Sequence, residues 1–105
     1  MTASKRLLYL EKITAEGSTD PFAWYGLALE YRNAERWDEA LQTFTTLRTA
    51  HADYVPLYLM CGQMLEKLGR KDEARDWLEA GIAAARAKKD THALGELESA
   101  LAGLE

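Results

Sequence analysis

The side chains in this sequence that could do acid–base, metal or nucleophilic chemistry are isolated from one another. The only histidines are His51 and His92, and neither belongs to a zinc-binding spacing or stands near a nucleophile-elbow pattern. Cys61 is the single cysteine, so the chain cannot form an internal disulfide. Acid–base catalysis and zinc binding need several such groups at defined positions. The sequence therefore predicts a protein that is not an enzyme, with no catalytic residue, no metal ligand and no cofactor.

The charge balance excludes a second group of functions. The 105 residues carry 13 Lys and Arg against 17 Asp and Glu, a formal net charge of -4 at pH 7. Binding to nucleic-acid phosphates needs a surplus of basic residues, so we expect no nucleic-acid partner. The basic residues Arg86, Lys88 and Lys89 end a predicted helix, where they complement its dipole. No apolar run approaches the ~20 residues that span a bilayer, so we expect no membrane partner.

The thiol and the N-terminal residues favour a cytoplasmic location. A single unpaired cysteine is a liability in a secreted domain. The apolar run Leu7–Leu10 is shorter than the core of a signal peptide, which has about 7–15 residues.

The composition predicts that helices alone position these side chains. Alanine (17) and leucine (16), both strong helix formers, far outnumber valine (1) and isoleucine (2). Asp20 is a good N-cap before Pro21, Pro56 opens a later helix, and Gly69 offers a left-handed C-cap. The expected helices cover about residues 3–16, 21–33, 37–50, 56–68, 71–88 and 90–104. Short turns make neighbours antiparallel, so the fold class is all-α with about six antiparallel helices.

A repeat with a period of 34 residues organises these helices. A shift of 34 residues aligns Arg36-x-Asp38-Glu39-Ala40 with Arg70-x-Asp72-Glu73-Ala74. Side-chain sizes also agree upstream, in the pairs Trp24 and Tyr58, Leu27 and Cys61, Ala28 and Gly62, and Tyr31 and Leu65. In each set the residues share one helical stripe. Ala28 and Gly62 are small, which lets the second helix of each hairpin approach closely.

This pattern resembles the tetratricopeptide repeat (TPR), which reads W-x2-L-G-x2-Y and then A-x3-F. The matching residues are Trp24-x-x-Leu27-Ala28-x-x-Tyr31 with Ala40-x-x-x-Phe44, and more loosely Tyr58-x-x-Cys61-Gly62-x-x-Leu65 with Ala74-x-x-x-Leu78. Ala28 replaces the usual glycine, and the usual proline after each second helix is absent. The resemblance implies a right-handed α-α superhelix, a TPR solenoid, as one domain over residues 1–105. Its parts are an N-terminal helix (1–20), repeat 1 (21–54), repeat 2 (55–88) and a C-terminal capping helix (89–105).

The two flanking helices are assigned by register. A step of 34 residues back from Phe44 gives Leu10, so the N-terminal helix aligns with a second helix. At the other end an offset of 36 residues places Leu94, Leu97 and Leu101 on the stripe of Tyr58, Cys61 and Leu65. Glu98 then takes the place of the small Gly62. A charge at that position predicts that no further helix packs, as expected of a terminal cap.

A second apolar stripe marks the candidate binding surface. Phe22, Tyr25 and Leu29 lie roughly 150° from the core stripe, where a surface helix should be polar. In TPR proteins this face of the first helices lines the concave groove. The resemblance implies a peptide-binding groove, limited to two first helices, formed by Phe22, Tyr25, Leu29, Arg32, Asn33, Leu59, Gln63 and Glu66.

The character of this groove restricts its ligands. It is apolar at one end and polar at the other, which suits a helical or extended apolar peptide. Some chaperone-binding members hold a C-terminal carboxylate with a clamp of Lys and Asn. Tyr25, Leu29 and Met60 hold positions of that clamp here, so the two-carboxylate clamp is absent.

These features favour an adaptor or scaffold for protein–protein interaction, whose partner is a protein or peptide of unknown identity. Three alternatives stay open. The chain could form a homodimer or larger assembly module that buries the same groove. The N-terminal helix or the cap could cover the second stripe. The protein could also be a chaperone for a secreted or assembling client, since a client segment would use the same groove.

Overall fold

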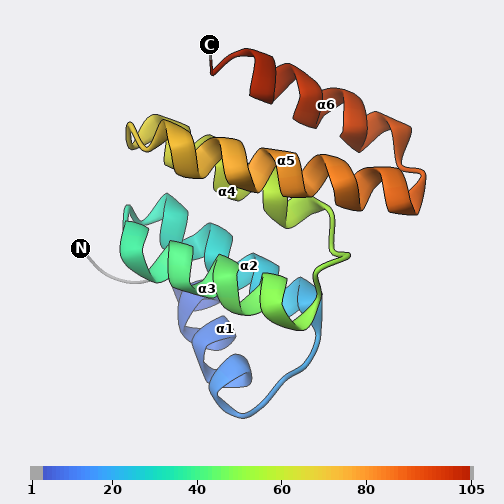
Figure 1. Cartoon of the computed structure of the whole chain (residues 1–105). Helices are drawn as coiled ribbons and strands as arrows, with labels where there is room; N and C mark the ends of the chain where they lie inside the picture. Colours follow the sequence, from blue (N-terminus) through green and yellow to red (C-terminus); the bar gives the residue numbers. More distant parts are fainter. Residues whose placement is uncertain (1–3, 105) are drawn as a thin grey trace. The chain divides into compact units, whose positions relative to one another are not determined.

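Six α-helices joined by short turns make up the computed structural model, which describes residues 4–104 (Figure 1). The helices are α1 (Lys5–Ala15), α2 (Pro21–Asn33), α3 (Trp37–Ala50), α4 (Pro56–Lys67), α5 (Lys71–Lys88) and α6 (Thr91–Ala102). No β-strand occurs between residues 4 and 104. The predicted all-α fold class is confirmed.

Aspartate side chains cap the starts of α2 and α6, and the sequence predicted the first of these caps. The Asp20 carboxylate accepts the backbone N–H of Phe22 at 3.0 Å, directly before Pro21. Asp90 caps α6 in the same way, because its carboxylate accepts the N–H of Ala93 at 3.0 Å. α6 is nevertheless shorter at both ends than predicted. The predicted start of the first helix at Ala3 lies outside the described residues.

The turns after α2 and α4 share one backbone conformation but not one residue type. Gly69 follows α4 with a φ of 78°, which confirms the predicted left-handed turn. The equivalent position after α2 is Glu35, whose φ is 60°. Only glycine adopts this region without steric cost, so the sequence pattern did not indicate it at Glu35.

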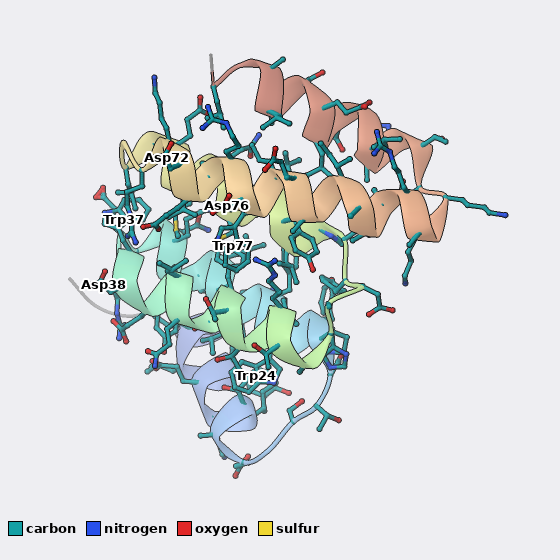
Figure 2. All side chains as sticks on the ribbon, in the orientation of Figure 1. Trp24, Trp37, Asp38, Asp72, Asp76 and Trp77 are labelled. Atoms are coloured by element: carbon teal, nitrogen blue, oxygen red, sulfur yellow. The ribbon has the colours of Figure 1, made fainter. Side chains whose placement is uncertain are left out.

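The chain divides into two compact units, and the first comprises Met1–His51. In this unit α2 packs along α3, and α1 packs along α2. Leu10 of α1, Leu27 of α2 and Phe44 of α3 are buried in its core. Trp24, which Figure 2 labels, donates its indole N–H to the carbonyl of Ser18 at 2.7 Å. That bond ties α2 to the loop that precedes it.

The second unit comprises Ala52–Glu105, in which α4 packs along α5 and α6 contacts both. Leu65, Leu78 and Leu97 come from the three helices and are buried together in this unit. The ring of Trp77 on α5 (Figure 2) lies against Tyr58 of α4, with centroids 6.3 Å apart. The core of each unit therefore draws on three helices.

Small residues permit the close helix contacts, as predicted. Ala28 and Ala40 of the first hairpin are fully buried, as is Ala74 of the second. A Cβ atom on Gly62 would lie 2.6 Å from Cδ2 of Leu78, a separation that real Cβ atoms essentially never show. The side-chain sizes on the shared stripe are therefore set by the approach of the second helix.

Candidate functional site

The residues predicted to line the groove belong to both units, five to the first and three to the second. On α2, Phe22 and Asn33 are exposed, whereas Tyr25, Leu29 and Arg32 are half-buried. Phe22 is 62% exposed, a large apolar side chain left in water.

The N-terminal helix packs on the adjacent side of α2. A Cβ atom on Gly26 would lie 3.0 Å from the Arg6 guanidinium and 3.4 Å from Leu10, both on α1. Arg6 also lies 3.7 Å from the Glu30 carboxylate, which accepts the Ser4 hydroxyl at 2.8 Å. The alternative in which α1 covers the second stripe is therefore wrong for Phe22.

In the second unit, two of the predicted residues line an open cleft between α4 and α6. Leu59 and Gln63 form its α4 wall, and the cleft has a volume of about 760 Å³. Glu66, also predicted, is exposed on α4 but does not line this cleft. The α6 wall consists of Thr91, His92, Gly95, Glu96, Ser99 and Ala100.

The α6 residues of this cleft were missed by sequence reasoning, which limited the groove to two first helices. The signal was present, because the 36-residue offset that aligns Leu94 with Tyr58 also aligns Gly95 with Leu59 and Ser99 with Gln63. The α6 wall was missed because the sequence analysis assigned α6 only the role of a terminal cap. The helix assigned as a cap also supplies one wall of a cleft.

The cleft presents hydrogen-bonding groups around a small apolar floor. Gln63 and Ser99 bring an amide and a hydroxyl, and His92 lies 3.3 Å from Glu96. Gly95 leaves the space between these α4 and α6 side chains open, since a Cβ atom there would have no neighbouring atom within 4 Å. Such a lining offers hydrogen-bond donors and acceptors beside apolar side chains.

A hydrogen-bonded network joins all three helices of the first unit. The Tyr31 hydroxyl donates to the Glu11 carboxylate at 2.6 Å. Arg36 donates to both oxygens of Glu39, at 2.6 and 2.7 Å, and its guanidinium carbon lies 4.8 Å from the centre of the Tyr31 ring. The bond between Tyr31 and Glu11 links α2 to α1. The bonds between Arg36 and Glu39 link the turn after α2 to helix α3.

This network shifts three pKa values. Burial, together with the hydrogen bond to Glu11, raises the pKa of Tyr31 to about 12. The hydrogen bond from Arg36 lowers the pKa of Glu39, and the same bond raises the pKa of Arg36. The raised pKa keeps the Tyr31 phenol neutral, and therefore able to donate its hydrogen bond to Glu11, at physiological pH.

Cys61, His51 and His92 have different local surroundings. Cys61 is fully buried in the core of its hairpin. His51 bonds through Nε2 to the carbonyl of Thr19 at 3.0 Å, in the other unit from His92. Among residues 4–104, no group of three or more His, Cys, Asp or Glu side chains could hold a metal ion. None of the described helices is long and apolar enough to cross a membrane.

Antiparallel helical hairpins at a 34-residue spacing, with an open cleft, define a helical-repeat protein. A family model described as tetratricopeptide repeat matches residues 31–97, and the chain belongs to the tetratricopeptide repeat family. TPR repeats generally mediate protein–protein interactions, and the family is typically non-catalytic.

Solved structures of small bacterial proteins share this fold. A crystal structure of a TPR domain protein from Salinibacter ruber is 35% identical, covers 81% of this chain and 94% of its own, and has a TM-score of 0.75. A solution NMR structure of a TPR domain protein from the same organism is 36% identical, covers 82% and 87%, and has a TM-score of 0.78. A protein from Bordetella parapertussis is 27% identical, covers 99% and 89%, and has a TM-score of 0.81. No curated protein matches this chain.

Proposed function

We propose that this protein is a non-enzymatic adaptor that binds a helical or extended apolar segment of a protein partner. The binding surfaces are the face of α2 that carries Phe22, Tyr25 and Leu29, and the cleft between α4 and α6. The observation that carries the proposal is this cleft, because it is lined by two of the residues that the TPR resemblance implies for the groove, Leu59 and Gln63.

The dimensions of the cleft support a peptide ligand. A volume of about 760 Å³ falls within the range of roughly 300–1,000 Å³ that is typical of ligand sites. The cleft is open along its length between two helices, so a chain can enter and leave without a terminus being threaded. Gly95 keeps this space free, since nothing within 4 Å would oppose a Cβ atom there.

The α2 face supports an apolar ligand in the first unit. Phe22 is 62% exposed although burial of a phenyl ring contributes about 2–3 kcal/mol. Aromatic anchors of this kind dominate the energetics of many protein interfaces. Arg32 and Asn33, which bond to each other, provide polar contacts at the other end of the same face.

Blocking the cleft tests this function directly. A binder is selected from a phage-displayed random-peptide library, and its Kd is measured by calorimetry. We expect Gly95→Tyr to weaken binding about tenfold or more, equivalent to about 1.4 kcal/mol, because the ring fills the cleft. Phe22→Glu tests the α2 face in the same titration.

The matched control is Ala87→Tyr, which adds the same ring at an exposed position on α5 that lines none of the described clefts. We expect it to bind as the wild type does. A selection without any binder, or wild-type affinity in both Gly95→Tyr and Phe22→Glu, contradicts the proposal.

Two other functions use the same residues. A homo-oligomeric assembly module that buries the groove predicts that Phe22→Glu and Gly95→Tyr convert an oligomer into a monomer of 11.8 kDa. A chaperone predicts that the bound segment belongs to an unfolded or assembling client. We favour the adaptor because its requirement, an open cleft beside predicted groove residues, is met within one unit. We place it in the cytoplasm, where the buried Cys61 thiol stays reduced.

A further inference from the structure

A second apolar surface lies on α1, outside the residues of the proposed function. Leu8 is 55% exposed and Tyr9 is 62% exposed, although both are large and apolar. Lys5 and Lys12 are exposed one turn before and after them. Residues spaced three and four apart share a helix face, so these four side chains form one apolar and basic surface, the α1 face.

A second cleft lies between α5 and α6, apart from the cleft of the proposed function. Its volume is about 550 Å³, and its lining residues are Glu79, Ile82, Arg86, Glu98, Leu101 and Ala102. Ile82 and Leu101 are half-buried, whereas Glu79 and Glu98 are exposed. Arg86 partly neutralises the negative charge of Glu98, since its guanidinium lies 3.8 Å from that carboxylate. The cleft is therefore apolar along its floor and acidic at its edges.

We propose that the α1 face of one copy of this chain docks into the α5–α6 cleft of a second copy. Leu8 and Tyr9 would pack on Ile82 and Leu101. Lys5 and Lys12 are opposite in charge to Glu79 and Glu98, which are exposed at the rim. The two surfaces carry apolar centres and edges of opposite charge.

Charge complementarity identifies the occupant as a second copy. The cleft edge favours a basic partner, and the α1 face supplies paired lysines beside exposed apolar groups in the same chain. Glu98, at the position where repeat 2 has Gly62, was predicted to prevent any further helix from packing. Within residues 4–104 only α4 and α5 contact α6. The carboxylate of Glu98 instead selects a helix that brings a lysine.

The proposed contact joins two different surfaces, so it is heterologous. Each copy keeps one free face after a single contact, which allows rings or longer chains of subunits rather than only closed dimers. This distinguishes it from self-association through the groove, which leaves α1 and the α5–α6 cleft unused.

The test uses three forms of the full chain. In Leu8→Glu/Tyr9→Glu the α1 face is disabled, and in Glu79→Lys/Glu98→Lys the cleft is disabled; all four positions are exposed, so the fold is retained and circular dichroism verifies it. Asp38→Lys/Asp76→Lys, on exposed positions outside this cleft and outside the predicted groove (both are labelled in Figure 2), carries the same charge change as a control. Sedimentation velocity measures association over a concentration series.

We expect the wild type and the control to form species beyond the monomer of 11.8 kDa as concentration rises. Each disabled variant alone stays monomeric, with association at least about tenfold weaker, and an equimolar mixture of the two forms a species of twice the monomer mass and no larger. Raising the salt from about 50 to 500 mM weakens the association, because it screens the lysine–glutamate pairs.

Three results overturn the proposal. They are a wild type that stays monomeric at about 1 mM, disabled variants that associate as the wild type does, or a mixture of the two that stays monomeric. Loss of association in Gly95→Tyr also overturns it, because that variant alters only the α4–α6 cleft. The peptide-binding proposal is tested by a different measurement, the Kd of a selected peptide. Either proposal can therefore fail without the other.

Discussion

Glycine positions in the second unit show how single residues set the packing and leave space for a ligand. Gly81 lies where α5 meets both of its neighbours, and a Cβ atom there would be 2.5 Å from Cβ of Tyr58 and 2.9 Å from Leu97. Gly95 faces the open α4–α6 cleft, and nothing opposes a Cβ atom there. One glycine is needed for a close contact, whereas the other costs helix stability without a packing reason.

Alanine at these two positions should change stability in opposite directions. We expect Gly81→Ala to lower the free energy of unfolding by about 1–3 kcal/mol, because the neighbouring backbone and core must shift. Gly95→Ala should raise it by about 0.5–1 kcal/mol, since alanine favours the helix and meets no neighbour. Urea denaturation followed by circular dichroism measures both. A stabilised Gly81→Ala variant would show that α4 and α6 both move away from α5 at little cost.

At the scale of elements, α1 is held by a small core and a polar network. Leu7 and Leu10 are buried against the rest of the first unit. The Tyr31 hydroxyl bonds to Glu11 of α1 at 2.6 Å, and the raised pKa of Tyr31, about 12, reflects its burial and this bond. The network depends on a neutral Tyr31 phenol, because ionised Tyr31 would place a second negative charge beside the Glu11 carboxylate.

The docking of α1 should weaken in strong alkali. The folded state raises the pKa of Tyr31 from 10.0 to about 12, so its stabilising contribution is fully present below pH 10 and is lost as pH rises toward 12. We expect the free energy of unfolding to fall across this window, and to fall less in Tyr31→Phe, which has no phenol to ionise. Denaturation at a series of pH values measures both.

The control for this experiment is Tyr9→Phe, which removes a phenol from an exposed position on the same unit. It should keep the alkaline loss seen in the wild type. An identical pH dependence in Tyr31→Phe and the wild type would contradict the role of the network.

Element by element, local chemistry predicted where helices begin and end. Asp20 and Asp90 accept backbone N–H groups two and three residues further along the chain, whereas Pro21 and Pro56 act through their fixed φ and missing N–H, so nearby sequence is sufficient. The left-handed turn at Glu35 was not predicted, because its φ of 60° occurs at a residue type that does not indicate such a turn. The α6 wall of the cleft was not predicted, because it depends on how α6 packs against α4 and α5.

At the scale of the whole molecule, the chain has a negative net charge and divides into two compact units. The net charge of -4 gives no basic surplus for nucleic-acid binding. The units Met1–His51 and Ala52–Glu105 each have a core of three helices. A single TPR domain over residues 1–105 stays a prediction, as does a peptide groove shared by α2 and α4.

The chain should not bind nucleic acid even at low salt. We expect no change in the fluorescence anisotropy of labelled double-stranded DNA up to about 100 µM protein in about 50 mM salt, because even non-specific binding requires neutralised phosphates. The control is Glu66→Lys/Asp76→Lys, whose formal charge is higher by four. A salt-dependent rise in anisotropy with the wild type would contradict the exclusion.

The sequence by itself determined the secondary structure, the repeat and the family, because helix capping and side-chain periodicity act over short distances and the 34-residue pattern occurs twice. The groove that the TPR resemblance implies, formed by α2 and α4, stays a prediction. Only the tertiary structure decided that Gly95 and Ser99 line the α4–α6 cleft, that Phe22 stays uncovered by α1, and that Glu11 bonds to Tyr31. Each of these depends on the angle and depth at which one helix packs on another, which the residues along a single helix do not specify.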